Sequence, residues 1–163
     1  MHPAILILSL FAFLSTSIQA PVVSPLDINR LKGNNWAGKL IYLDYKSEEK
    51  VTLKCNLVIK ADPADRNAWS FEFSYPEEPK ANRTSKVVLS KDGRTFDDEK
   101  VVSYSKADGT LSFSTEAKGE DNHKPSTFRH IYEASKDSFV IIKMVRYDGE
   151  KEFFERNRYS WRR

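Results

Sequence analysis

A histidine and a tyrosine on one expected strand are the residues best placed for chemistry. Strand alternation across residues 127–134 puts Phe128, His130 and Tyr132 on one face and Arg129 on the other. Histidine titrates near neutral pH, so it can exchange protons or hydrogen-bond the polar end of a ligand. A buried His–Tyr pair can equally be structural, with its hydrogen bonds satisfied inside the fold. Both interpretations require Phe128 to face inward, and both stay open.

Other side chains that could bind a metal or attack a substrate are few. His2 lies in the first twenty residues, His123 lies in a polar segment, and Cys55 is the only cysteine. Cys55 alternates in register with apolar neighbours, which favours a buried thiol over a nucleophile. No nucleophile elbow, phosphate-binding loop or His-Glu-x-x-His motif occurs. We therefore expect no catalytic residue, metal or cofactor; the enzymatic alternative uses His130 with a neighbouring tyrosine or arginine.

The clearest strand pattern carries aromatic side chains. Trp69, Phe71, Phe73 and Tyr75 share one face, opposite serine and glutamate. Such a face either packs as core or lines a cavity. We predict a ligand site formed by the following residues: Trp69, Phe71, Phe73, His130, Tyr132 and Arg129.

Alternating segments recur about every ten residues, which predicts an all-β fold. The expected strands are 36–45, 51–60, 69–75, 86–90, 100–105, 110–117, 127–134, 138–147 and 151–161. Asp-Gly pairs mark tight turns, and no long helix is available for parallel crossovers. We therefore expect an antiparallel up-and-down β-barrel of eight to ten strands, with a β-sandwich as the alternative.

One short helix and two loops complete the expected elements. Ser24 can cap a helix that begins at Pro25 and ends by Lys32. Segments 76–85 and 118–126 are rich in polar residues and proline, which predicts irregular loops.

Gly33 and Trp36 stand at the start of the first expected strand, directly after this helix. With the meander that follows, they resemble the lipocalin and calycin superfamily. That family places an arginine from the last strand across the tryptophan, closing the base of the barrel. The resemblance implies that Arg156, Arg158 or Arg162 packs on Trp36, and that the barrel can enclose one small apolar molecule.

The last strand also forms the densest basic stretch. Its alternation places Arg156, Arg158, Ser160 and Arg162 on one face. This face is either solvated or a contact for an anionic lipid, glycan or protein surface.

The N-terminus predicts export. Residues 1–20 contain no charged side chain, and their apolar run, 4–14, is short for a membrane span. We expect a signal peptide over 1–20, with cleavage after Ser17 or an uncleaved anchor as alternatives. One lipocalin-like domain over 21–163 would then be secreted or periplasmic, without a stable membrane span.

The charge balance bears on partners. The formal net charge is only +3, and acidic residues interrupt the basic ones throughout. We expect no nucleic-acid partner. The leading hypothesis is non-enzymatic binding of a small hydrophobic or amphipathic ligand inside the barrel. The alternative is a fully packed barrel that acts as a structural or protein-interaction module.

Overall fold

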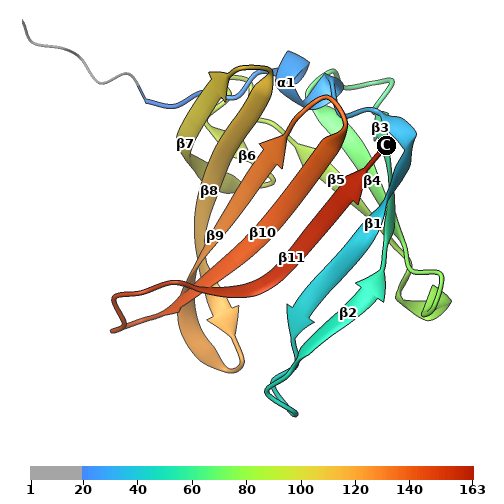
Figure 1. Cartoon of the computed structure of the whole chain (residues 1–163). Coiled ribbons are helices and arrows are strands. Elements are labelled where there is room, and N and C mark those ends of the chain that lie inside the picture. The colour runs from blue at the N-terminus through green and yellow to red at the C-terminus, as the bar shows by residue number, and fades with distance from the viewer. Residues whose placement is uncertain (1–19) are drawn as a thin grey trace, which may run out of the picture.

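The computed structural model describes residues 20–163, which form one nearly closed antiparallel barrel with a short helix (Figure 1). The expected signal peptide, 1–20, lies almost entirely outside the described residues. The helical elements are α1 (Pro25–Asn29) and the 3-10 turn η1 (Pro79–Ala81). The strands are β1 (Gly33–Leu43), β2 (Lys50–Lys54), β3 (Asn56–Ala61), β4 (Ala68–Ser74), β5 (Arg83–Val88), β6 (Thr95–Phe96), β7 (Glu99–Ala107), β8 (Thr110–Asp121), β9 (Lys124–Ala134), β10 (Ser138–Tyr147) and β11 (Phe154–Arg162).

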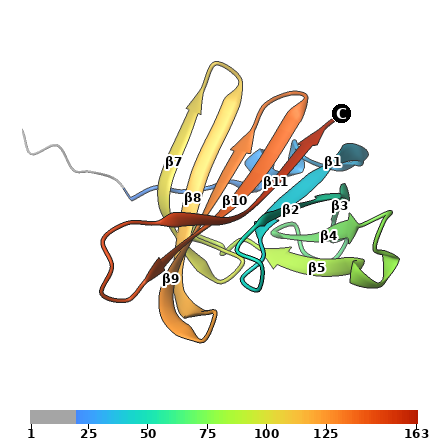
Figure 2. The same ribbon diagram turned by 60° about the horizontal axis from the view of Figure 1, so that its bottom comes forward.

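The first and last strands are hydrogen-bonded to each other, which makes the fold a barrel. β1 pairs with β11 from Ala37↔Arg162 to Tyr42↔Asn157, and the sheet order is β5-β4-β3-β1-β11-β10-β9-β8-β7-β6. A bridge between Leu89 and Phe96 joins the two ends of this order. The up-and-down barrel is therefore confirmed. Figure 2 shows β3–β5 on one side of the interior and β7–β10 on the other.

The sheet contains eleven strands, where eight to ten were expected. One difference is the two-residue strand β6. The other is a break at Cys55, which divides the expected strand 51–60 into β2 and β3. The Cys55 amide donates to the Gly38 carbonyl at 2.9 Å. β1 runs so close to β11 here that a Cβ at Gly38 would lie 2.0 Å from the Ser160 carbonyl oxygen, so only glycine fits.

The turn chemistry explains where the loop predictions hold and fail. Asp108 and Gly109 both have positive φ and join β7 to β8, as their Asp-Gly signal predicts. The expected loop 118–126 is wrong, because β8 and β9 continue through it to a turn at Asn122 and His123. These two residues also have positive φ, 49° and 61°, and so form a tight turn without glycine. In the other expected loop, 76–85, β5 already begins at Arg83.

Helix α1 closes one end of the barrel, called here the closed end (Figure 1). Ser24 and Asp27 form a capping box, as the expected helix start requires. The Asp27 side chain is buried and also accepts from Lys106 Nζ at 2.9 Å and from the Tyr104 hydroxyl at 3.2 Å. The helix ends at Asn29, earlier than the predicted Lys32. Its one complete turn is thus fixed to β7 by a buried carboxylate.

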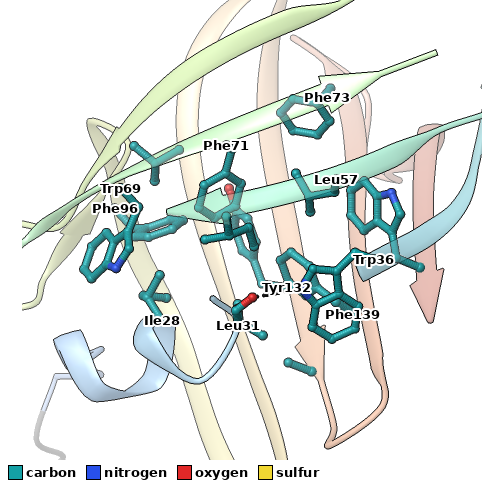
Figure 3. Close-up of a cluster of buried hydrophobic side chains, with 14 of the residues drawn as sticks. Ile28, Leu31, Trp36, Leu57, Trp69, Phe71, Phe73, Phe96, Tyr132 and Phe139 are labelled. Carbon is teal, nitrogen blue, oxygen red and sulfur yellow. Dashed lines mark hydrogen bonds between the residues drawn. The ribbon is translucent and has the colours of Figure 1, made fainter. Parts of the chain in front are cut away.

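Large aromatic side chains fill the closed end (Figure 3). Trp36 and Phe139 lie with ring centroids 6.1 Å apart, and Phe139 stacks on Trp161 at 5.5 Å. The indole N–H of Trp36 donates to the Leu31 carbonyl at 2.8 Å, and that of Trp161 donates to the Cys55 carbonyl at 2.9 Å. The polar atom of each ring is therefore satisfied within an apolar core.

An arginine does lie across Trp36, but it is Arg163 rather than Arg156, Arg158 or Arg162. The Arg163 guanidinium carbon lies 4.2 Å from the Trp36 ring centroid. The same group donates to the carbonyls of Arg30 and Lys136, at 3.2 and 3.1 Å. The sequence prediction was wrong because Arg163 lies one residue beyond the last strand, where its chain can turn back over the ring.

Candidate functional site

The inward side chains of the barrel form successive layers across paired strands. The first layer, at the closed end, consists of Leu111, Ala134, Phe139 and Trp161. The second consists of Phe113, Tyr132, Ile141 and Tyr159. The third, called here the polar layer, consists of Thr115, His130, Lys143 and Asn157. Each of these strands therefore changes from apolar to polar at the same depth.

A cavity of about 310 Å³ lies beside the polar layer. Apolar side chains from both sides of the barrel form one part of its wall: Phe71, Phe73, Val87, Phe96, Tyr132 and Ile141. Polar side chains form the other part: Arg83, Ser85, Asp97, Glu99, His130, Lys143, Asn157 and Tyr159. The cavity thus has an apolar wall and a hydrogen-bonding wall that face the same space.

Glu99 and His130 form the central polar contact of the cavity. His130 Nδ1 lies 2.8 Å from Glu99 Oε2, and the Thr115 hydroxyl donates to the same oxygen at 2.5 Å. The two side chains are only 20% and 15% exposed for His130 and Glu99. This contact fixes the imidazole through Nδ1, so its Nε2 is the ring atom left to meet a ligand.

The environment of Glu99 favours its charged form. Burial by itself raises the pKa of this carboxyl, but the hydrogen bond and charge of His130 and the hydrogen bond from Thr115 outweigh burial and lower the pKa below its usual value. Glu99 therefore carries a negative charge at neutral pH, next to the imidazole.

The positive charge of Lys143 has no carboxylate at hydrogen-bonding distance among the described residues. Its nearest carboxylate is Asp121, at 3.8 Å, which is longer than a hydrogen bond. The ammonium also lies 3.9 Å from the Phe128 ring centroid. Burial is the main cause of a lowered Lys143 pKa. An anionic or hydrogen-bond-accepting ligand group near Lys143 would relieve this cost.

The carboxyl group of Asp97 lies in the wall of the cavity. Burial of the carboxyl is the first cause of a raised pKa, and the charges of Glu99 and Asp98 add to it. Tyr132, by contrast, is buried, and burial raises its pKa so far that the phenol stays neutral. The cavity therefore offers charged groups of both signs and a neutral hydroxyl.

A second polar cluster lies beyond Lys143, at the far ends of β8 and β11. The Tyr45 hydroxyl donates to Asp121, Arg156 Nε lies 3.8 Å from Asp121, and the Arg156 guanidinium carbon lies 4.1 Å from the Tyr45 ring centroid. Arg156 also donates to the Leu43 carbonyl. Arg156 thus ties the end of β1 to β8, which is a structural role unlike the one predicted for it.

The structure brings together Phe71, Phe73, His130 and Tyr132 of the predicted ligand-binding residues. Trp69 does not line the cavity, because it is 1% exposed in the closed end and donates to Asn29 Oδ1 at 3.0 Å.

Arg129 also lies away from the cavity. It faces outward, where its Nε donates to Glu116 at 2.8 Å and its guanidinium carbon lies 4.4 Å from the Phe153 ring. Arg158 is likewise outside and pairs with Glu155.

Sequence reasoning missed Glu99 and Lys143. Lys143 lies two residues after Ile141 on the same strand, so alternation alone predicts that both side chains face inward. Glu99 opens its strand next to the sequence Asp97-Asp98, which is indistinguishable from a solvated acidic turn. Only the pairing of β8 with β7 and β9 places it beside His130.

Residues 20–163 contain neither a candidate metal cluster nor a membrane-spanning helix. No group of three or more histidine, cysteine or acidic side chains there could hold a metal ion. The helices described are too short to cross a bilayer.

No protein-family model matches the chain, and no curated protein matches it at significant similarity.

Proposed function

We propose that this protein binds one small amphipathic molecule, without catalysis, in the cavity beside the polar layer. The observation that carries the proposal is the composition of the cavity wall. Phe71, Phe96 and Tyr132 offer apolar surface, while His130 and Lys143 offer polar contacts to the same space. A cavity serving only as a packing defect has no need of a lysine and a glutamate–histidine pair in its wall.

The cavity volume indicates the size of the ligand. About 310 Å³ is at the lower end of the range for small-molecule pockets. Burial of apolar ligand surface would supply about 25 cal/mol per Å². A compact molecule with one polar end fits this space better than a large or multiply charged one.

The polar end of the ligand would lie at His130 and Lys143. Glu99 holds His130 through Nδ1, which directs the other imidazole nitrogen to the ligand. Lys143 lacks a carboxylate at hydrogen-bonding distance among the described residues, so a ligand acceptor can bind it without displacing a strong ion pair. These two residues replace Arg129 in the expected set.

The proposal extends to kinship and compartment. The stacking of Arg163 on Trp36 and the pairing of β1 with β11 support descent from the lipocalin and calycin superfamily.

The charge-free segment 1–20 supports export to the periplasm or the extracellular space. N-terminal sequencing of the mature protein after expression with its full leader tests export, and an intact Met1 would contradict it.

A dye titration with matched variants tests the ligand site. Anilinonaphthalene sulfonate should fluoresce on binding the purified protein. Ser85→Phe, which fills the cavity, should weaken binding by at least about tenfold, whereas Thr84→Phe on the outward face of the same strand should leave it unchanged.

Two results would contradict the proposal. One is equal dye binding by both variants, which would place the dye on the surface. The other is no dye binding and no co-purified small molecule in native mass spectrometry. Either result would favour the alternative of a barrel that acts as a structural or protein-interaction module.

A further inference from the structure

The cavity adjoins a second hollow on the other side of Arg83. This recess measures about 360 Å³, and its apolar wall consists of Leu40, Tyr42, Leu53 and Tyr75. Arg83 and Asn157 line both the cavity and the recess. The side chains of Arg83 and Asn157 therefore separate the cavity from the recess.

Arg83 is the larger and the more exposed of the two shared side chains. Its guanidinium carbon lies 4.3 Å from the Phe73 ring centroid. Its two side-chain hydrogen bonds, to Ser85 Oγ at 3.5 Å and to the Tyr159 hydroxyl at 3.4 Å, are long. It forms no ion pair with any side chain of residues 20–163. The stack on Phe73 and two long hydrogen bonds are therefore the contacts that a ligand must displace to move this side chain.

We infer that Arg83 is a partition that limits the length of the ligand, and that the recess is a second subsite for an apolar tail. This inference rests on the proposed function. A ligand confined to the cavity ends at Arg83. A longer ligand reaches Leu40 and Leu53 only if the guanidinium moves off Phe73.

The chemistry of the two hollows defines the class of longer ligand. The cavity places its polar groups at His130 and Lys143, and the recess places apolar side chains beyond Arg83. A single unbranched chain with one polar end fits this order. The polar end stays at His130 and Lys143, and the tail passes Arg83.

A homologous series of straight-chain alcohols, from hexanol to hexadecanol, measures the length of the site. Alcohols carry no charge, so loss of Arg83 removes no ion pair with the probe. Each methylene that finds apolar surface should improve affinity about fourfold. In the unchanged protein, this gain should stop at the chain length that fills the cavity.

Arg83→Ala should move that limit to longer alcohols, and the gain should continue for several further methylenes. Filling the recess as well, with Arg83→Ala and Ala81→Phe together, should return the limit to its original length. Lys86→Ala removes the next cation of β5, which faces outward and pairs with Asp62, and should leave the limit unchanged. Arg83→Gln places a shorter polar side chain at the partition and should also move the limit to longer alcohols. This variant preserves the test if Arg83→Ala folds poorly.

The failures are distinguishable. If alcohols bind but the limit is the same in the unchanged protein and the Arg83 variants, the partition is overturned and the cavity proposal stands. If no alcohol binds any variant, the proposed function falls and the partition falls with it.

Discussion

The closed end and the polar layer are built on the same strands, yet they present opposite chemistry. β10 passes from Phe139 through Ile141 to Lys143, and β11 passes in register from Trp161 through Tyr159 to Asn157. At the first of these depths, indole and phenyl rings stack without charged neighbours in the layer. Two layers deeper, a lysine and an imidazole share the interior with a cavity.

The difference shows that stability and recognition are separated along the barrel axis. Burying a large aromatic side chain stabilises a fold, whereas burying Lys143 costs desolvation energy that its contacts only partly return. A barrel packed like the closed end throughout would be more stable. The polar layer is therefore the part whose composition packing alone does not explain.

Trp36→Ala should produce the largest effect and would test the closed end. The ring is 1% exposed, and its removal leaves a large void and an unpaired Leu31 carbonyl. We expect the free energy of unfolding in urea to fall by about 3–5 kcal/mol. Asn157→Ala in the polar layer should cost clearly less. Equal losses for these two variants would break the comparison.

Asp27→Asn should have the next largest effect. Burial by itself raises the pKa of Asp27, but hydrogen bonds from Lys106 and Ser24 outweigh it and lower the pKa. A carboxylate with a lowered folded-state pKa stabilises the protein above its unfolded value, about 4, and loses that contribution as pH falls through the folded value. We expect Asp27→Asn to cost about 2 kcal/mol at neutral pH.

The pH dependence provides the control for Asp27. Below the folded-state pKa, the unchanged protein and Asp27→Asn should converge in stability, as measured by thermal unfolding across an acid series. A constant difference at every pH would show that the loss comes from helix capping geometry rather than from the charge.

Glu99→Gln should cost less, about 1 kcal/mol, because the amide keeps a hydrogen bond and the site is partly reached by water. The pKa of Glu99 is lowered in the folded state, as that of Asp27 is. The stabilisation by the Glu99 carboxylate is therefore also lost as pH falls through its folded-state pKa. The same variant should change dye affinity, because His130 loses the negative charge of the partner that orients it. Unchanged dye binding together with a large loss of stability would assign the pair to structure alone.

Arg163→Ala should have the smallest effect on the closed end, about 1 kcal/mol, from the lost contact with the Trp36 ring and the carbonyl hydrogen bonds. Arg162→Ala is its matched control, since Arg162 is exposed and precedes it by one residue. Urea unfolding of both variants measures the difference. Equal effects would remove the closure role from Arg163.

Local patterns predicted the strands because alternation is a local property. Residues 138–147 were predicted as a strand and form β10 with the same bounds. The inward face of His130 and Tyr132 also followed from alternation once Phe128 faced inward. The turn at Asn122 and His123 was missed because neither residue is glycine, so the sequence lacked the usual signal for positive φ.

The site itself depends on pairings that no single segment contains. Glu99 meets His130 only because β8 lies between their strands in one register, and a shift of one residue would turn Thr115 and His130 outward. Arg163 was missed for a similar reason, since its contact with Trp36 spans almost the whole chain. Alternation predicts which face a residue occupies, but not which residue of another strand it meets.

The most direct test is to map a bound ligand by amide chemical-shift changes in the ¹⁵N-labelled protein titrated with anilinonaphthalene sulfonate. The account predicts saturable shifts centred on Phe71, His130, Tyr132 and Lys143, with Ile28 and Trp36 in the closed end unmoved. Shifts confined to the outer face of the barrel, or centred on the closed end, would contradict it.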